Sequence, residues 1–132
     1  MPKKFKLTQV EWELMQSVWE LGDKTTARDV HNRTFPNGEK AYTTVQTILN
    51  KLVEKGMLNR EKIGMVNFFS PAVSRAEMIK KELSFFVTDI FNDSVPDLAN
   101  FIIDSNNLSL QDIDNIKQFI KKKEQELREN HD

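Results

Sequence analysis

The fold of this chain is decided by one stretch, residues 42–56, which reads YTTVQTILNKLVEKG. Its large apolar residues recur at the spacing of a single helix face: Val45, Ile48, Leu49, Leu52 and Val53. Gly56 follows as the expected residue after a helix C-terminus, because glycine adopts the left-handed conformation without strain. The pattern therefore predicts a helix over residues 42–55 that buries one face.

The opposite face of this helix carries hydroxyls and amides, where an ordinary solvated face favours Glu and Lys. Its members are Thr43, Thr44, Gln46, Thr47, Asn50 and Lys51. Short polar side chains can donate to or accept from base edges, and threonine methyls can touch the thymine methyl group. Three threonines near a helix start also lower helix propensity, so structure alone is a poor reason for them. We interpret this face as that of a DNA recognition helix.

Two more helices are predicted upstream of this stretch. Thr8 and Thr26 each precede an acidic residue by three positions, which is the spacing of a capping box, so helices are expected over residues 8–21 and 26–33. The second helix starts with free backbone N–H groups, the Thr26 hydroxyl and the Arg28 guanidinium. Together these groups can hold a DNA phosphate.

Downstream, residues 57–62 and 66–70 are predicted to form two short strands of a hairpin. Arg60 and Lys62 lie just before its tip, which suits a wing lying along the DNA backbone. The order of three helices and a hairpin therefore predicts a winged helix-turn-helix, assigned to residues 1–73.

The remaining residues, 74–132, show only helical patterns and predict a three-helix lobe. The expected fold class is thus mainly α with a small β-hairpin wing. The second lobe carries more large apolar side chains than so short a segment can bury, so we expect it to dimerise. The predicted interface residues are Phe86, Ile90, Leu98, Ile113, Ile116 and Ile120.

Charge and composition restrict the function further. Residues 1–73 carry 11 Lys/Arg and 8 Asp/Glu, whereas residues 74–132 carry 8 and 12, so a polyanionic partner fits the first half. The sequence has no cysteine, which excludes disulfides and thiolate metal sites. No apolar run is long enough for a membrane span and no secretory signal is present, so a cytoplasmic location is expected.

Catalysis is not expected, because the chain has no glycine-rich phosphate loop, no GxSxG and no HExxH. His31 and His131 lack partners at metal-ligand spacing. We therefore expect neither a metal site nor a cofactor.

The chain resembles the penicillinase-repressor family, which includes BlaI, MecI and the copper repressor CopY. The resemblance spans residues 5–75 and is carried by Leu7-Thr8, Glu11-Trp12-Glu13-Leu14-Met15, Val18-Trp19, Thr26-Ala27-Arg28-Asp29-Val30, Thr44-Val45-Gln46-Thr47-Ile48-Leu49-Asn50-Lys51-Leu52, Lys55-Gly56 and Phe69-Ser70-Pro71. It implies a transcriptional repressor that binds palindromic operators with TACA/TGTA-type half-sites as a homodimer. Lys51 stands where the family usually has Arg, and Phe69 where it usually has Tyr.

The second half separates the branches of that family. Copper-responsive members end in a cysteine motif, which this chain lacks. The resemblance to the antibiotic-resistance branch implies a membrane receptor-protease system that responds to a cell-wall or antibiotic signal. In that branch a bond between Asn and Phe in the dimerisation lobe is cleaved, and Asn100-Phe101 stands at the matching place. The alternative is that Phe101 is simply a core aromatic.

Two other functions stay open at this point. The chain can be a ligand-sensing winged-helix regulator, with Met78, Phe85 and Phe86 lining a pocket between the two lobes instead of a dimer core. It can also be a protein-interaction module whose third helix docks on a partner.

Overall fold

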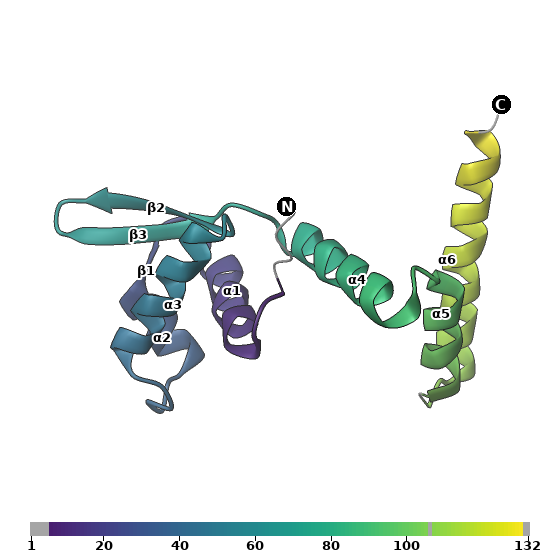
Figure 1. Ribbon diagram of the computed structural model, residues 1–132, viewed down its shortest axis with the longest axis horizontal. Coiled ribbons are helices and arrows are strands. Elements are labelled where there is room, and N and C mark those ends of the chain that lie inside the picture. The colour runs from purple at the N-terminus through teal and green to yellow at the C-terminus, as the bar shows by residue number, and fades with distance from the viewer. Residues whose placement is uncertain (1–5, 106, 131–132) are drawn as a thin grey trace. The chain divides into compact units, whose positions relative to one another are not determined.

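The computed structural model describes residues 6–105 and 107–130, which form helices and one small antiparallel sheet (Figure 1). The elements in chain order are α1 (Gln9–Leu21), β1 (Thr25–Thr26), α2 (Ala27–Thr34), α3 (Tyr42–Glu54), β2 (Leu58–Ile63), β3 (Val66–Pro71), α4 (Arg75–Phe91), α5 (Val95–Ser105) and α6 (Leu110–Glu129). This architecture confirms the mainly helical fold class with a hairpin wing.

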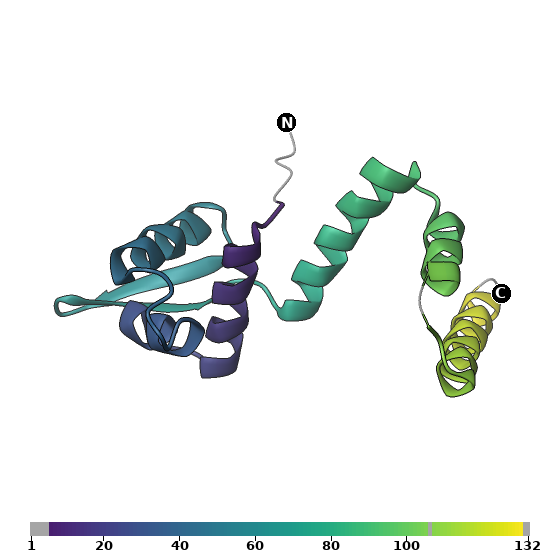
Figure 2. The ribbon, with the colours of Figure 1, turned by 90° about the horizontal axis from the view of Figure 1, so that it is seen from below.

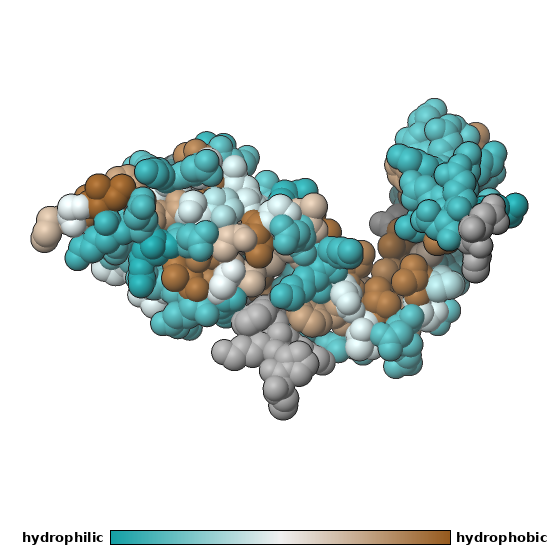
Figure 3. All heavy atoms as spheres, turned by 90° about the horizontal axis from the view of Figure 1, so that it is seen from above, coloured by the Kyte–Doolittle hydropathy of each residue, from teal (hydrophilic) through white to brown (hydrophobic). Residues whose placement is uncertain are grey.

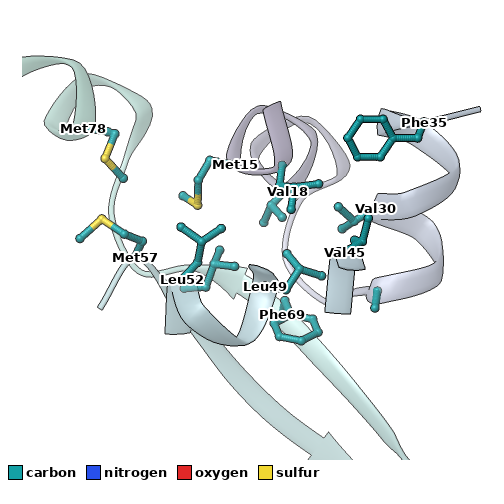
Figure 4. Packing of buried hydrophobic residues seen from close by; sticks show 13 residues of the cluster. Met15, Val18, Val30, Phe35, Val45, Leu49, Leu52, Met57, Phe69 and Met78 are labelled. Atoms are coloured by element: carbon teal, nitrogen blue, oxygen red, sulfur yellow. The ribbon is translucent and has the colours of Figure 1, made fainter. Parts of the chain in front are cut away.

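The chain divides into two compact units, one up to Asp89 and one from Ile90. Most of α4 therefore belongs to the first unit, although its sequence pattern groups it with the helices that follow. The cause is packing: Met78 of α4 is only 2% exposed and belongs to the core of the first unit (Figure 4). The functional boundary after residue 73 stays a prediction.

The core of the first unit is built from the apolar faces of its helices and from residues of the two hairpin strands, Leu58 of β2 and Phe69 of β3 (Figure 4). Burial is complete or nearly so for Leu14, Met15, Val18, Val30, Val45, Leu49, Leu52 and Phe69. On α3 the buried positions Val45, Leu49 and Leu52 are spaced by four and three residues, so they form one stripe. The opposite side of α3 is thereby turned to solvent.

Local signals set the helix starts as predicted. Thr8 and Thr26 both form complete capping boxes, with Glu11 and Asp29 as the reciprocal partners. The third helix ends one residue earlier than expected, and Gly56 follows it with a φ of 80°, a left-handed conformation that costs glycine little.

The hairpin pairs β2 with β3 in antiparallel register, with Lys62 opposite Asn67 and Gly64 in the turn. It extends beyond the helices of its unit in two perpendicular views (Figures 1 and 2). A third strand, β1, pairs with β3 and places Thr25 opposite Phe69, so the sheet order is β1-β3-β2. Only two strands are expected from the sequence, because the two residues of β1 are too few to show a strand pattern.

The second unit is far less buried than the first. Neither α5 nor α6 has a buried residue within the part of the chain that the structure describes. Figure 3 shows brown spheres among hydrophilic ones on this unit. Its large apolar side chains that lie exposed include Val95, Phe101, Ile102, Ile103, Leu110, Phe119, Ile120 and Leu127. Among the described residues, no helix combines the length and apolar character needed to cross a bilayer.

One carboxylate links the start of α1 to the end of α3. Glu11 accepts a hydrogen bond from the Thr8 backbone N–H through Oε1, at 2.8 Å, and pairs through Oε2 with Lys55 Nζ at 2.6 Å. Burial acts to raise the pKa of Glu11, but the hydrogen bonds from Lys55 and Thr8 and the Lys55 charge outweigh it. The pKa of Glu11 is therefore lowered from its ordinary value of 4.5.

Replacing Glu11 with Gln should lower the free energy of unfolding by roughly 1–3 kcal/mol, because a buried charged acceptor is lost and Lys55 loses its counter-ion. Urea unfolding at pH 7 measures this. Glu20→Gln is the matched control, since Glu20 pairs with Arg33 at 3.5 Å where both side chains are nearly half exposed. That control should cost less than about 1 kcal/mol.

The same pair of proteins tests the pH dependence. A carboxyl group with a lowered pKa stabilises the fold above its unfolded pKa, and this contribution is lost as the pH falls through the folded pKa. The difference between wild type and Glu11→Gln should therefore shrink below pH 4.5. A difference that stays constant into acid would contradict the ion pair.

Candidate nucleic-acid interface

The polar face of α3 is accessible, as the sequence predicts. Thr43, Thr44, Thr47 and Lys51 are exposed, and Gln46 and Asn50 are partly exposed. They lie opposite the buried stripe of Val45, Leu49 and Leu52, because a helix turns by about 100° per residue. The core therefore fixes which way all six polar side chains point.

Several of these side chains already have partners within the chain. Thr47 Oγ1 donates to the Thr43 carbonyl at 3.0 Å, so its methyl group and its oxygen lone pairs remain for another contact. Asn50 Oδ1 accepts from Arg60 Nη1 of β2 at 2.5 Å. This bond ties the far end of the polar face to the base of the wing.

Tyr42, the first residue of α3, is a member of this surface that the sequence analysis did not assign. Its hydroxyl accepts a hydrogen bond from Gln46 Nε2 at 3.2 Å, and its ring lies 4.0 Å from the Arg28 guanidinium carbon. Residues 42 and 46 are one helical turn apart, so the contact of Tyr42 with Gln46 could have been expected from the sequence. The contact with Arg28 depends on how α2 packs against α3, and no pattern in the sequence indicates it.

Two of the backbone N–H groups at the start of α2, expected from the sequence to be free, already have side-chain partners. Thr26 Oγ1 accepts from the Asp29 backbone N–H at 3.1 Å, and Asp29 Oδ2 accepts from the Thr26 N–H at 3.3 Å. The carboxylate thus already uses the positive end of this helix. Arg28 is exposed beside it and can meet a phosphate, and the Thr26 hydroxyl, which accepts from Asp29, still has its own O–H to donate.

The wing presents its two basic residues on one side. Arg60 and Lys62 are exposed and two positions apart on β2, so their side chains leave the same face of the strand. Glu61 leaves the other face and lies 3.7 Å from Lys24 Nζ. The bond between Arg60 and Asn50 shows that the basic face is the one turned toward α3.

Parts of the chain far apart in sequence meet in one hollow of about 190 Å³. It is lined by Thr26 and Ala27 of the α2 start, by Tyr42, Gln46 and Asn50 of α3, and by Met65, Val66, Asn67 and Phe69 of the hairpin. The structure therefore brings the three predicted DNA-contacting segments together on one side of the first unit.

The remaining predicted residues belong to α4 and the second unit. Asn100 and Phe101 are exposed on α5, and the Phe101 ring packs edge-on against Phe91 with centroids 5.5 Å apart. Of the predicted dimer residues, Phe86, Ile90 and Ile120 are exposed, whereas Leu98, Ile113 and Ile116 are partly buried.

A groove of about 520 Å³ lies in the first unit. It is lined by Met57, Val73, Glu77, Met78, Lys80, Lys81, Ser84 and Phe85. Two of the three residues expected for a ligand pocket, Met78 and Phe85, are among them, and Phe86 is not.

No metal centre is seen in the residues that the structure describes, where no three His, Asp or Glu side chains cluster to bind an ion. His31 lies within α2, and its Nε2 is 2.7 Å from the carbonyl of Lys40 in the α2–α3 connection. His131 lies outside the described residues.

Comparison with known proteins identifies the family. Residues 7–122 match the family model for the penicillinase repressor. The chain is 22% identical to the penicillinase repressor of Bacillus licheniformis over 124 residues, which are 94% of this chain and 96% of that protein. It is 27% identical over 115 residues to the uncharacterised 16.5 kDa protein in the ptsI 3′ region of Latilactobacillus sakei, covering 87% of this chain and 78% of that one.

Among solved structures, the chain is similar to the DNA-binding domain of the repressor BlaI. The TM-score is 0.50 and the identity 26%, over 58% of this chain and 93% of that domain. The family match covers most of the chain, including α3. The chain belongs to the penicillinase repressor family and is a DNA-binding transcriptional repressor, not an enzyme.

Proposed function

We propose that the protein represses transcription by binding a palindromic operator with TACA/TGTA-type half-sites as a homodimer. The observation that carries the proposal is the meeting of α3, Arg28 and the basic face of the wing on one side of the first unit. In winged-helix proteins the recognition helix enters the major groove, and phosphate-contacting groups, the wing among them, lie on either side of that helix.

The proposed roles follow from the position of each side chain. The polar face of α3 reads base edges with Thr43, Thr44, Gln46, Thr47, Asn50 and Lys51. Arg28 and Thr26 on one side, and Arg60 and Lys62 on the other, contact the phosphate backbone and set the register. Residues 1–73 are the proposed DNA-binding domain.

Dimerisation is proposed for residues 74–132, with a second copy of the chain as the partner. None of the apolar side chains described on α5 and α6 is buried, and such surfaces are rare on monomers. A two-fold dimer also presents two recognition helices to the two halves of a palindrome, so protein and operator symmetry match.

Release of the repressor is proposed to occur by cleavage between Asn100 and Phe101 through a membrane receptor-protease system. Both residues are exposed, with Phe101 60% exposed, so a protease can reach them. The bond lies inside α5, and a helix must unwind locally before a protease can bind it as an extended segment. Because no residue of α5 is buried, the free-energy cost of this local unwinding is small.

A second candidate is control by a small ligand in the groove beside α4. Its floor includes the buried Met78, and Lys80 stands at its rim. An apolar floor with a nearby cation suits an amphipathic anion. A ligand of this class would change operator affinity without cleaving the chain.

The direct test is a fluorescence-anisotropy titration with a TACA/TGTA palindrome and with a scrambled duplex, each at two salt concentrations. We expect a preference of about 10³ or more for the palindrome. The affinity for both duplexes should fall with salt as counterions are released. Equal, weak and salt-insensitive binding to both would contradict the proposal and favour a protein partner for α3.

Two substitutions separate base reading from phosphate contact. Thr47→Ala should relax the sequence preference at one base position by roughly 1–3 kcal/mol, because the methyl and hydroxyl on the reading face are lost. Lys62→Ala should weaken binding to palindrome and scrambled duplex alike and reduce the salt slope by about 1. Equal losses on both duplexes for both variants would remove this division of roles.

The dimer is tested by Ile120→Glu, which places a charge where the side chain is exposed in one chain but is buried in the proposed dimer. Sedimentation should show a dimer for wild type and a monomer for the variant at micromolar concentration. Affinity for the palindrome should fall about 10²-fold or more, while half-site affinity is kept. Lys117→Glu on the same helix is the control, and a wild-type monomer would refute the dimer.

A further inference from the structure

Tyr42 stands between two side chains that are proposed to touch DNA. Its hydroxyl accepts from Gln46 Nε2 at 3.2 Å on one side, and its ring faces the Arg28 guanidinium carbon at 4.0 Å on the other. One half-buried tyrosine therefore contacts both a proposed base-reading residue and a proposed phosphate-contacting residue.

The tyrosine ring is itself held in place from the α2 side. His31 packs against it edge-on, with ring centroids 5.9 Å apart and planes at 84°. The His31 ring is fixed in turn, because Nε2 lies 2.7 Å from the Lys40 carbonyl and must donate to it. Tyr42 therefore has little freedom to move with Gln46 and Arg28. Instead, Tyr42 positions these two side chains.

The hydroxyl leaves Gln46 with a defined set of groups. A glutamine amide has one oxygen and two N–H groups, and the hydroxyl takes one N–H. The other N–H and the oxygen of this partly exposed side chain remain available for a further contact. These are the two groups needed for a bidentate contact with adenine, in which the oxygen accepts from N6 and the nitrogen donates to N7.

The ring has a different effect on Arg28. A guanidinium stacked on an aromatic face keeps its N–H groups in the plane of the fork, where they can still bind a phosphate at the edge. Because it is stacked rather than freely rotating, less side-chain freedom is lost when the phosphate binds.

We propose that Tyr42 is a positioning residue that orients Gln46 to read an adenine and holds Arg28 for a phosphate. This inference rests on the proposed function of α3 as a recognition helix. The two contacts of Tyr42 have different consequences for DNA binding. The hydroxyl, through Gln46, affects sequence preference, and the ring, through Arg28, affects affinity for any duplex.

The test compares Tyr42→Phe, which removes only the hydroxyl, with Tyr42→Leu, which also removes the ring. Wild type and variants are selected against a library of randomised duplexes, and the salt dependence of binding is measured on the selected sequence. Tyr42→Phe should lose roughly ten-fold of the adenine preference at one position of each half-site, with the salt slope unchanged. Tyr42→Leu should also bind all duplexes more weakly, with a salt slope reduced by about 1.

Matched control variants show whether the loss of adenine preference acts through Gln46 and the reduced salt slope through Arg28. Gln46→Ala should lose the preference at the same position as Tyr42→Phe, and the double variant should lose little more, since the two residues act together. Arg28→Ala should reproduce the reduced salt slope of Tyr42→Leu. In a duplex with 7-deazaadenine at that position, wild type should lose affinity, whereas Gln46→Ala should be insensitive because it no longer contacts N7.

Unfolding curves of all variants separate positioning from loss of fold. A Tyr42→Phe protein that folds normally and keeps the full adenine preference overturns the inference, as does a loss spread equally over all positions. A Gln46→Ala effect at a position that is not adenine overturns it as well. If wild type selects no motif, the proposed function fails first and this inference fails with it; the other outcomes leave that function standing.

Discussion

The burial of one side of α3 is the constraint on which the rest of the molecule depends. Val45, Leu49 and Leu52 are fully buried against Leu14 and Met15 of α1 and the rest of the core. Burying three such side chains contributes several kcal/mol at about 25 cal/mol per Å² of apolar surface, far more than any single polar contact at the surface. Rotating α3 would expose this stripe, so the direction of its polar face is set by the core.

The wing is placed by the same helix. Glu11 holds the end of α3 through Lys55, and the chain turns at Gly56 directly into Met57 and β2. Arg60 then reaches back to Asn50 on α3. The second unit contrasts with this, because its helices have no buried residue among those described and their apolar faces lack a comparable anchor within the unit. One half of the chain is fixed by its own core, whereas the proposed function of the other half needs a second copy.

Sequence reasoning succeeded where the signal is local. Capping boxes at Thr8 and Thr26 join residues three positions apart, so their helices could be predicted closely, and the polar face of α3 followed from periodicity. It failed where a contact joins distant segments. The two residues of β1 form a strand only because β3 passes beside them, and the stacking of Arg28 on Tyr42 depends on how α2 meets α3. The packing of Met78 with the first unit likewise had no signal in the helical pattern.

The start of α3 differs from the starts of the other described helices. In the described residues, the other helices begin with a Ser or Thr oxygen that accepts a backbone N–H, whereas Ala41 gives α3 no side-chain cap. A missing cap costs about 0.5–2 kcal/mol, and threonines in the first turn add to that cost. Tyr42 offsets part of it through its contacts with Arg28 and His31. The first turn is thus held by packing against α2, which leaves the hydroxyls of Thr43 and Thr44 at the exposed surface, where a recognition helix needs them.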